Sequence, residues 1–189
     1  MKNIYKLFLA LALVLGVSSC QESDLYVDEL LDSVDKTGVI LRTLQAPSDL
    51  LNNTSSPSID IEIEVQEGNG SEAPDFKEVR VYLSLFEDQD GVTEIEGTTE
   101  TQIMTLPAAD FYTSDFNKLP AYMIMIPTTM VQATFPADTE YTTPTFIVTR
   151  LECEMNDGRI FSTEDVGEAV ATGDYYASPY RYNTIYIND

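Results

Sequence analysis

An eight-residue alternation at positions 59–66 is the feature that most constrains the fold of this chain. Isoleucine or valine occupies every odd position and an acidic or amide side chain every even one, in the order Ile-Asp-Ile-Glu-Ile-Glu-Val-Gln. Side chains of a β-strand point alternately to opposite faces, so this run predicts a strand with one face in a core and one face in water. Residues 79–85 repeat the pattern, with valine or leucine at each odd position.

The chain from residue 36 onward carries further strand signals and no long helical pattern. β-Rich runs lie at residues 38–43, 101–106, 121–126, 145–155, 159–162 and 180–187. Asn156-Asp157-Gly158 separates two of these runs and predicts a hairpin, with glycine where a positive φ is needed. About seven short strands joined by turns predict an all-β fold, an antiparallel immunoglobulin-like β-sandwich, over residues 36–189.

Three local expectations follow from residue types along these runs. Residues 121–126 are apolar at odd and even positions alike, which predicts a central strand that is well buried on both faces. Residues 107–111 predict a single helical turn. Residues 127–135 predict a short connecting helix, with Thr128 or Thr129 as its N-cap.

The first nineteen residues have the layout of a bacterial signal peptide. Two lysines precede an apolar run at residues 7–17, which is too short to span a bilayer of about 30 Å as a helix. Small residues then lead directly into Cys20, as lipoprotein processing requires. Its thiol would receive a diacylglyceryl group, and cleavage between Ser19 and Cys20 would free an amine for a further acyl chain. We therefore expect a signal peptide at 1–19 and a lipid on Cys20, with a plain secreted protein as the alternative.

Residues 20–35 form the expected lipidated and acidic tether. Gln21-Glu22-Ser23-Asp24 resembles the signal that exports lipoproteins to the outer face of the outer membrane in Bacteroidetes-type bacteria. The expected location is therefore the cell outer membrane, facing the extracellular side. Asp32-Ser33-Val34 resembles a bacterial O-glycosylation acceptor, which makes Ser33 a candidate glycan site.

The composition excludes several classes of chemistry. The chain has no histidine, so it lacks the commonest general base and the commonest transition-metal ligand, and Ser-His-Asp catalysis is excluded. Cleavage before Cys20 would remove Lys2 and Lys6, leaving 32 acidic side chains against 8 of the 10 basic ones and a net charge of −24 in place of −22. Such a surface repels nucleic acid, so no nucleic-acid partner is expected. Cys153 follows a strand pattern, which predicts a buried apolar residue.

Residues 87–91 form an acidic segment that ends in glycine. Asp88 and Asp90 resemble part of a calcium loop, but Phe86 and Gly97 stand where the first and closing ligands of an EF-hand belong. The segment is therefore interpreted as the tip of a hairpin. A weak calcium site at Asp88 and Asp90 is the alternative.

Five tyrosines are concentrated near residues 175–186. They are Tyr175, Tyr176, Tyr180, Tyr182 and Tyr186. A tyrosine offers a flat apolar face and a polar tip for binding, and it is also a good strand residue. The strand interpretation is favoured for each single tyrosine, whereas Tyr175 and Tyr176 lie in a Gly-Asp-Tyr-Tyr loop and are candidates for ligand binding.

Four short pieces of the chain occur in the order found in one family. They are Gly38-Val39-Ile40-Leu41-Arg42-Thr43, Leu119-Pro120, Asp157-Gly158-Arg159-Ile160-Phe161-Ser162 and Ser178-Pro179-Tyr180-Arg181-Tyr182. Together they resemble small surface lipoproteins of Bacteroidetes that are often encoded beside SusC/SusD-type nutrient importers. The resemblance spans most of residues 36–187. It implies an accessory lipoprotein, bound to a transporter complex or to its glycan or peptide substrate, and it assigns no catalytic residue.

These observations predict a non-enzymatic, surface-anchored binding protein with no cofactor besides its covalent lipid. Its expected partners are the membrane, a SusC/SusD-like transporter complex, and a glycan or peptide ligand. A structural subunit of a surface assembly such as a fimbria is one alternative, with the strand at residues 180–187 as the donor. A carboxylate-based hydrolase is the other, and it would need a deep pocket with convergent carboxylates.

Overall fold

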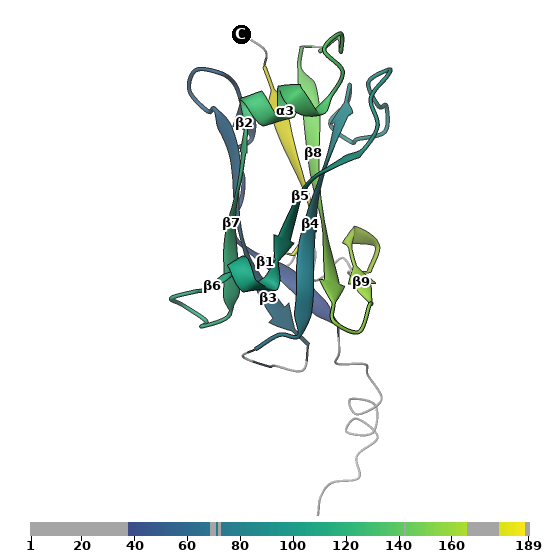
Figure 1. The fold of residues 1–189 in the computed structure, drawn as a ribbon. Coiled ribbons are helices and arrows are strands. Elements are labelled where there is room, and N and C mark those ends of the chain that lie inside the picture. The colour runs from purple at the N-terminus through teal and green to yellow at the C-terminus, as the bar shows by residue number, and fades with distance from the viewer. Residues whose placement is uncertain (1–37, 69–70, 72, 142, 166–177, 188–189) are drawn as a thin grey trace, which may run out of the picture. The chain divides into compact units, whose positions relative to one another are not determined.

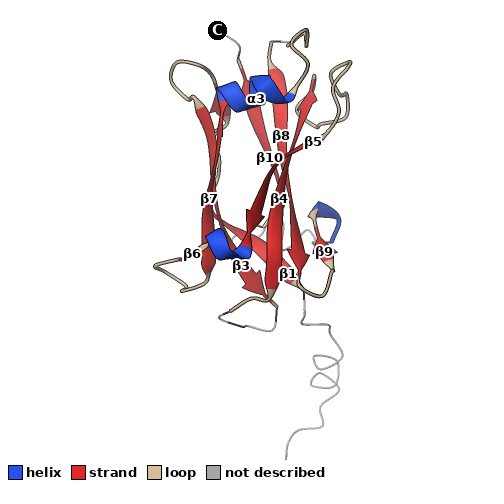
Figure 2. Cartoon of the chain, viewed as in Figure 1, coloured by secondary structure: helices blue, strands red, loops and turns tan. Residues whose placement is uncertain are grey.

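The computed structural model of the chain describes residues 38–68, 71, 73–141, 143–165 and 178–187. Within these residues the chain folds as two β-sheets packed face to face, with short helices at the ends of strands (Figures 1 and 2). Strand pairing is antiparallel except between β10 and β2. The prediction of an all-β sandwich is thus confirmed.

The first sheet has four strands, all antiparallel, in the order β1-β3-β7-β6. Their bounds are β1 (Val39–Gln45), β3 (Ser58–Glu67), β7 (Pro120–Pro127) and β6 (Tyr112–Thr113). We call this layer sheet A. Its first strand pairs with β3 from the Val39–Glu67 end onward, and the register shifts at a bulge between Thr43 and Gln45.

The second sheet, called sheet B, has six strands in the order β2-β10-β8-β4-β5, with β9 paired to β8. Their bounds are β2 (Leu50–Leu51), β10 (Arg181–Tyr186), β8 (Thr145–Met155), β4 (Phe76–Phe86), β5 (Thr101–Pro107) and β9 (Ile160–Phe161). The helical elements are η2 (Ala108–Asp110), α3 (Thr128–Thr134) and η3 (Thr163–Asp165). None of the described helices is long and apolar enough to cross a membrane.

The alternation of β3 and β4 places their apolar residues in the core between the sheets. Ile59, Ile61 and Ile63 of β3 are at most 1% exposed. The same holds for the odd positions of β4 from Val79 to Leu85. Cys153 of β8 is also fully buried, as predicted, and burial raises the pKa of its thiol to about 12. Seven strands have six or more residues and three have two, in agreement with the expected strand number.

Three tyrosines in and just before β10 bond to other elements of the domain, two of them to β1 in sheet A. Tyr180, Tyr182 and Tyr186 are at most 7% exposed. The Tyr180 hydroxyl donates to the first carbonyl oxygen of β1 at 2.8 Å, and the Tyr182 hydroxyl shares a hydrogen bond with Thr43 at 2.7 Å. The Gln132 amide of α3 donates to the Tyr186 hydroxyl at 2.9 Å. These three side chains are core residues, as the strand interpretation predicted.

Two local predictions are wrong. Strand β7 is not central, because beyond Ala121 its outer edge has no partner strand among the described residues, and Met125 is 59% exposed. The helix α3 has the predicted position, but no side chain caps it. Its N-cap is Pro127, and the Thr128 hydroxyl instead donates to the Pro57 carbonyl at 2.9 Å. Local sequence could not reveal this competing acceptor, which lies 71 residues away.

Candidate functional site

Most of the residues predicted to carry function lie outside the described part of the chain. These are Ser19, Cys20, Gln21, Glu22, Ser23, Asp24, Ser33, Tyr175 and Tyr176. Lipidation, surface export, O-glycosylation and the Gly-Asp-Tyr-Tyr loop therefore stay predictions.

Asp88 and Asp90 lie in the loop between β4 and β5. The Asp88 carboxylate accepts backbone hydrogen bonds from Thr93 at 2.7 Å and Val92 at 3.1 Å. These bonds, the one from Thr93 first, lower the pKa of Asp88 below its ordinary value. This is the geometry of a hairpin tip, with the carboxylate oxygens directed at the turn itself. No described residues form a group of three or more acidic or cysteine side chains that could hold a metal ion.

A groove crosses the outer face of sheet B, and the sequence patterns did not predict it. It consists of two pockets of about 500 and 270 Å³ that share Glu100, Arg150 and Arg181. The floor comes from outward-facing residues of β8, β4 and β10. One wall is the turn at residues 162–164, which begins η3, and the opposite wall includes Gly91 and Glu94 of the β4–β5 loop.

Arg150 of β8 is the fixed charge on the floor of this groove. Its guanidinium binds both carboxylate oxygens of Glu100, at 2.8 and 2.6 Å, and one of Glu152 at 2.7 Å. It also lies 4.3 Å from the centre of the Tyr82 ring, while the Tyr82 hydroxyl donates to Glu152 at 2.9 Å. The hydrogen bond to Glu100 is the main reason that the pKa of Arg150 is raised further. Arg150, Glu100 and Glu152 therefore use their charged groups to bind one another.

Arg181 is the charge on the groove floor that has no such partner. Its Nε atom is buried without a hydrogen-bond partner, and within the described residues its guanidinium makes no ion pair. Gly91 lies directly against it with a φ of +67°, and a β-carbon added at Gly91 would collide with the guanidinium. Glycine at this position of the loop thus lets the wall approach Arg181 closely while adopting a left-handed backbone.

The polar groups of the groove require a ligand with both donors and acceptors. A guanidinium only donates hydrogen bonds and a carboxylate only accepts them. Arg181 on the floor can therefore bind only an acceptor of the ligand, and Glu164 on the wall can bind only a donor. The hydroxyl groups of Ser162 and Thr163 can bind either. Hydroxyl groups of a glycan and amide groups of a peptide both meet this requirement.

The alternatives of catalysis and strand exchange can be compared with this geometry. In the groove, Glu100 and Glu152 serve as counter-ions of Arg150, whereas a general acid and base would need carboxylates aimed at a substrate. The strand named as a fimbrial donor, β10, pairs with β8 on one side and with β2 on the other. Its exchange would remove two buried tyrosines, Tyr182 and Tyr186, from the core of its own domain.

No protein-family model matches this chain, and a search of curated proteins found no significant match.

Proposed function

We propose that this chain is a lipid-anchored protein of the outer-membrane surface that binds a glycan or peptide without catalysing a reaction. In this proposal it acts as an accessory subunit of a SusC/SusD-type nutrient importer. The anchoring half rests on the sequence pattern that ends at Cys20. Binding is supported by one observation, the guanidinium of Arg181, which lines the sheet B groove and has no charged partner among the described residues.

Anchoring is tested by metabolic labelling with palmitate in the native host. The wild-type chain should incorporate label and Cys20→Ala should not. Label that persists in the variant, or that is absent from the wild type, would exclude the anchor.

Isolation of the tagged chain from native membranes in mild detergent tests whether the chain is a subunit of an importer. Co-isolation of a TonB-dependent transporter with its SusD-like subunit is the expected result, and recovery of the chain alone would contradict that role.

Ligand binding is tested by screening the full chain on glycan and peptide arrays and titrating the hits. Replacing Arg181 with methionine removes the guanidinium donors of that residue and leaves Arg150 in place, while keeping an apolar side chain of similar length. We expect Arg181→Met to weaken binding at least about tenfold, since a hydrogen bond to a charged group contributes roughly 1.5–3 kcal/mol.

Arg159→Met is the matched control for this measurement. Arg159 also carries an exposed guanidinium, but it pairs with Asp157 at 2.8 Å in the β8–β9 turn and does not line the groove. Equal loss of affinity in both variants would mean that the overall charge, rather than the groove, governs binding.

A further inference from the structure

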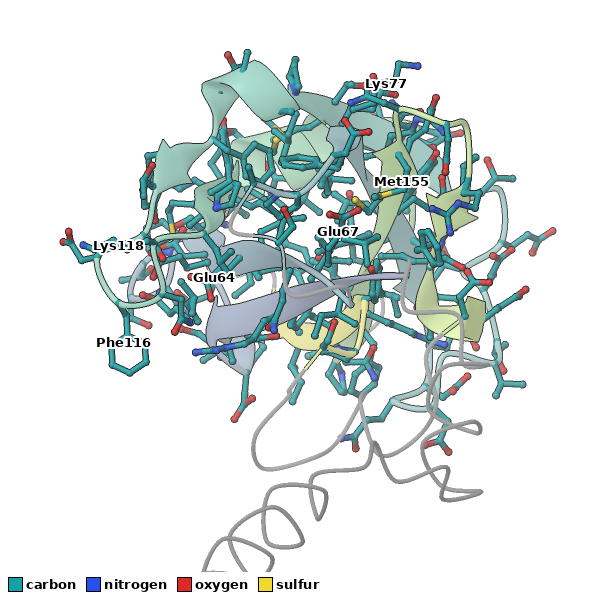
Figure 3. The ribbon with its side chains drawn as sticks, turned by 90° about the horizontal axis from the view of Figure 1, so that it is seen from below. Glu64, Glu67, Lys77, Phe116, Lys118 and Met155 are labelled. Carbon is teal, nitrogen blue, oxygen red and sulfur yellow. The ribbon has the colours of Figure 1, made fainter. Side chains whose placement is uncertain are left out.

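The loop between β6 and β7, residues 114–119, presents an aromatic side chain to solvent. Phe116 at its tip is 85% exposed. Two residues later, Lys118 has a φ of 61°, a left-handed conformation that is uncommon for a residue other than glycine. In Figure 3 the Phe116 ring points away from the ribbon, and Lys118 lies on the same loop.

This loop is held in place by a buried carboxylate. Glu64 lies on the outward-facing parity of β3, yet it is fully buried because the loop covers it. Its oxygens accept hydrogen bonds from the Ser114 hydroxyl and from the Asn117 amide at 2.6 Å, with the Arg42 guanidinium 3.9 Å away. A buried carboxylate is costly unless its oxygens are satisfied, so these contacts fix the loop on both sides of Phe116.

The loop lies at the end of the sandwich where the described part of the chain begins, at Gly38. The first residue of β1, Val39, pairs with Glu67 at the end of β3. Three residues earlier on the same strand, Glu64 pairs with Ala121 and holds the loop. Residues 38–39 and the loop therefore belong to the same end of sheet A, as Figure 1 also shows.

We propose that Phe116, flanked by Lys118, inserts into the surface of the bilayer to which the chain is anchored. The inference rests on the proposed lipid at Cys20. Gly38 lies only 18 positions after Cys20, and a chain of that length spans about 60 Å at most. An aromatic ring on a loop that also carries an ammonium group suits the boundary between acyl chains and phosphate groups, and the loop presents Lys118 two residues after Phe116 and the carboxylate of Asp115 directly before it.

The charge of the chain selects the kind of lipid contact. The net charge of −24 on residues 20–189, 8 basic against 32 acidic side chains, repels anionic headgroups, so long-range attraction cannot hold the domain against the membrane. Burial of the Phe116 ring is instead an apolar interaction, which salt does not screen. The contact should therefore form on zwitterionic phosphatidylcholine and persist at high salt.

The absence of tryptophan from the sequence makes a direct test available. Phe116→Trp introduces a single fluorescent reporter at the loop tip. Val92→Trp is the matched control, because Val92 is 80% exposed and belongs to the β4–β5 loop, which follows the end of β4 opposite the β6–β7 loop (Figure 1). Each mature chain, residues 20–189, is tethered through an N-terminal histidine tag to chelating lipids in phosphatidylcholine vesicles with brominated acyl chains.

Bromine quenches tryptophan only at close range, so the two variants report which end enters the bilayer. We expect several-fold stronger quenching and a blue-shifted emission for Phe116→Trp, unchanged at high salt, and little change for Val92→Trp. Equal quenching of both, or quenching of neither, would overturn the proposal. The tag replaces the lipid, so failure of the anchor at Cys20 appears only in the palmitate experiment and stays distinguishable from failure here.

Discussion

The outer faces of the two sheets carry glutamates in the same alternating pattern but differ in how far these side chains are buried and in what they bind. On sheet B, Arg80 and Arg150 lie among carboxylates of the same and neighbouring strands and of the β4–β5 connection, and every partner is partly exposed. These carboxylates are Glu78, Glu100, Glu152 and Glu154. On sheet A, Glu64 is fully buried and depends mainly on two uncharged donors.

The difference shows that the number of ion pairs around a charged side chain does not indicate how much that side chain contributes to the stability of the fold. Exposed pairs contribute about 0–1 kcal/mol each, because water screens them and holding two long side chains costs entropy. A buried charge loses its hydration, so removing its partners or the charge itself affects the fold far more. We therefore expect the sparse contacts of Glu64 to outweigh the dense network on sheet B.

Removing the Glu64 carboxylate should give the largest effect. Glu64→Ala leaves the buried Ser114 hydroxyl and the Asn117 amide without their acceptor, and we expect a loss of about 3 kcal/mol in the free energy of unfolding. Urea denaturation of the purified domain measures it. Glu62→Ala is the control two residues earlier on the same face, where the partner is the half-exposed Tyr112. It should cost less than about 1 kcal/mol, and equal losses would refute the distinction between the faces.

Replacing Arg150 should give an intermediate effect. Arg150→Met removes the ion pairs with Glu100 and Glu152 and the contact with the Tyr82 ring, for an expected loss of about 1 kcal/mol at neutral pH. A loss as large as that of Glu64→Ala would show that the charged groups on the outer faces of the two sheets contribute equally to the free energy of unfolding.

The Arg150 effect should also depend on pH. Partial burial alone would raise the pKa of Glu152, but hydrogen bonds from Arg150 and Tyr82 outweigh it and lower the pKa below 4.5. A carboxylate with a depressed pKa in the folded state stabilises the fold above its unfolded pKa, and this contribution is lost as pH falls through the folded pKa. The difference between wild type and Arg150→Met should therefore be constant near neutral pH and shrink below about pH 4.5. A difference that grows in acid would contradict this sign.

Removing Lys77 should give the smallest effect. Lys77 pairs with Glu154 at 2.7 Å, but half of its side chain is exposed. Lys77→Met should change the free energy of unfolding by only a few tenths of a kcal/mol. Added salt should abolish even this change. Thermal unfolding of wild type and variant at low and high salt measures it, and a change above 1 kcal/mol would show that exposed pairs in this network act cooperatively.

The sequence predicted the strands better than their surroundings. Period-two alternation depends only on neighbouring residues, so the long strands and the buried parity of β3 and β4 could be located in advance. The same parity argument placed Glu64 in water, and it failed because a loop 50 residues later covers that position. Strands β2 and β6 have two residues each and are defined by their partners, so no local pattern marks them.

The groove could not be predicted for the same reason. Arg150, Arg181 and Gly91 are distant in the chain and meet only because β10 and the β4–β5 loop adjoin β8 and β4. The one local signal was the glycine that ends the acidic segment at residues 87–91. It was interpreted correctly as part of a turn, but its close approach to Arg181 depends on the fold.

Tyr180 and Tyr182, just before and within β10, make contacts that can form only late in the synthesis of this domain. The hydrogen bonds of Tyr180 and Tyr182 reach β1 across 141 and 139 positions of the chain. The first described strand therefore cannot make these bonds until the last described strand has been synthesised. Until residues 180–186 have been synthesised, β1 lacks the two hydroxyl groups that bond to it, and the core lacks three of its buried tyrosines. A nascent chain interrupted before that point keeps an unfinished core, which chaperones can hold and proteases can remove.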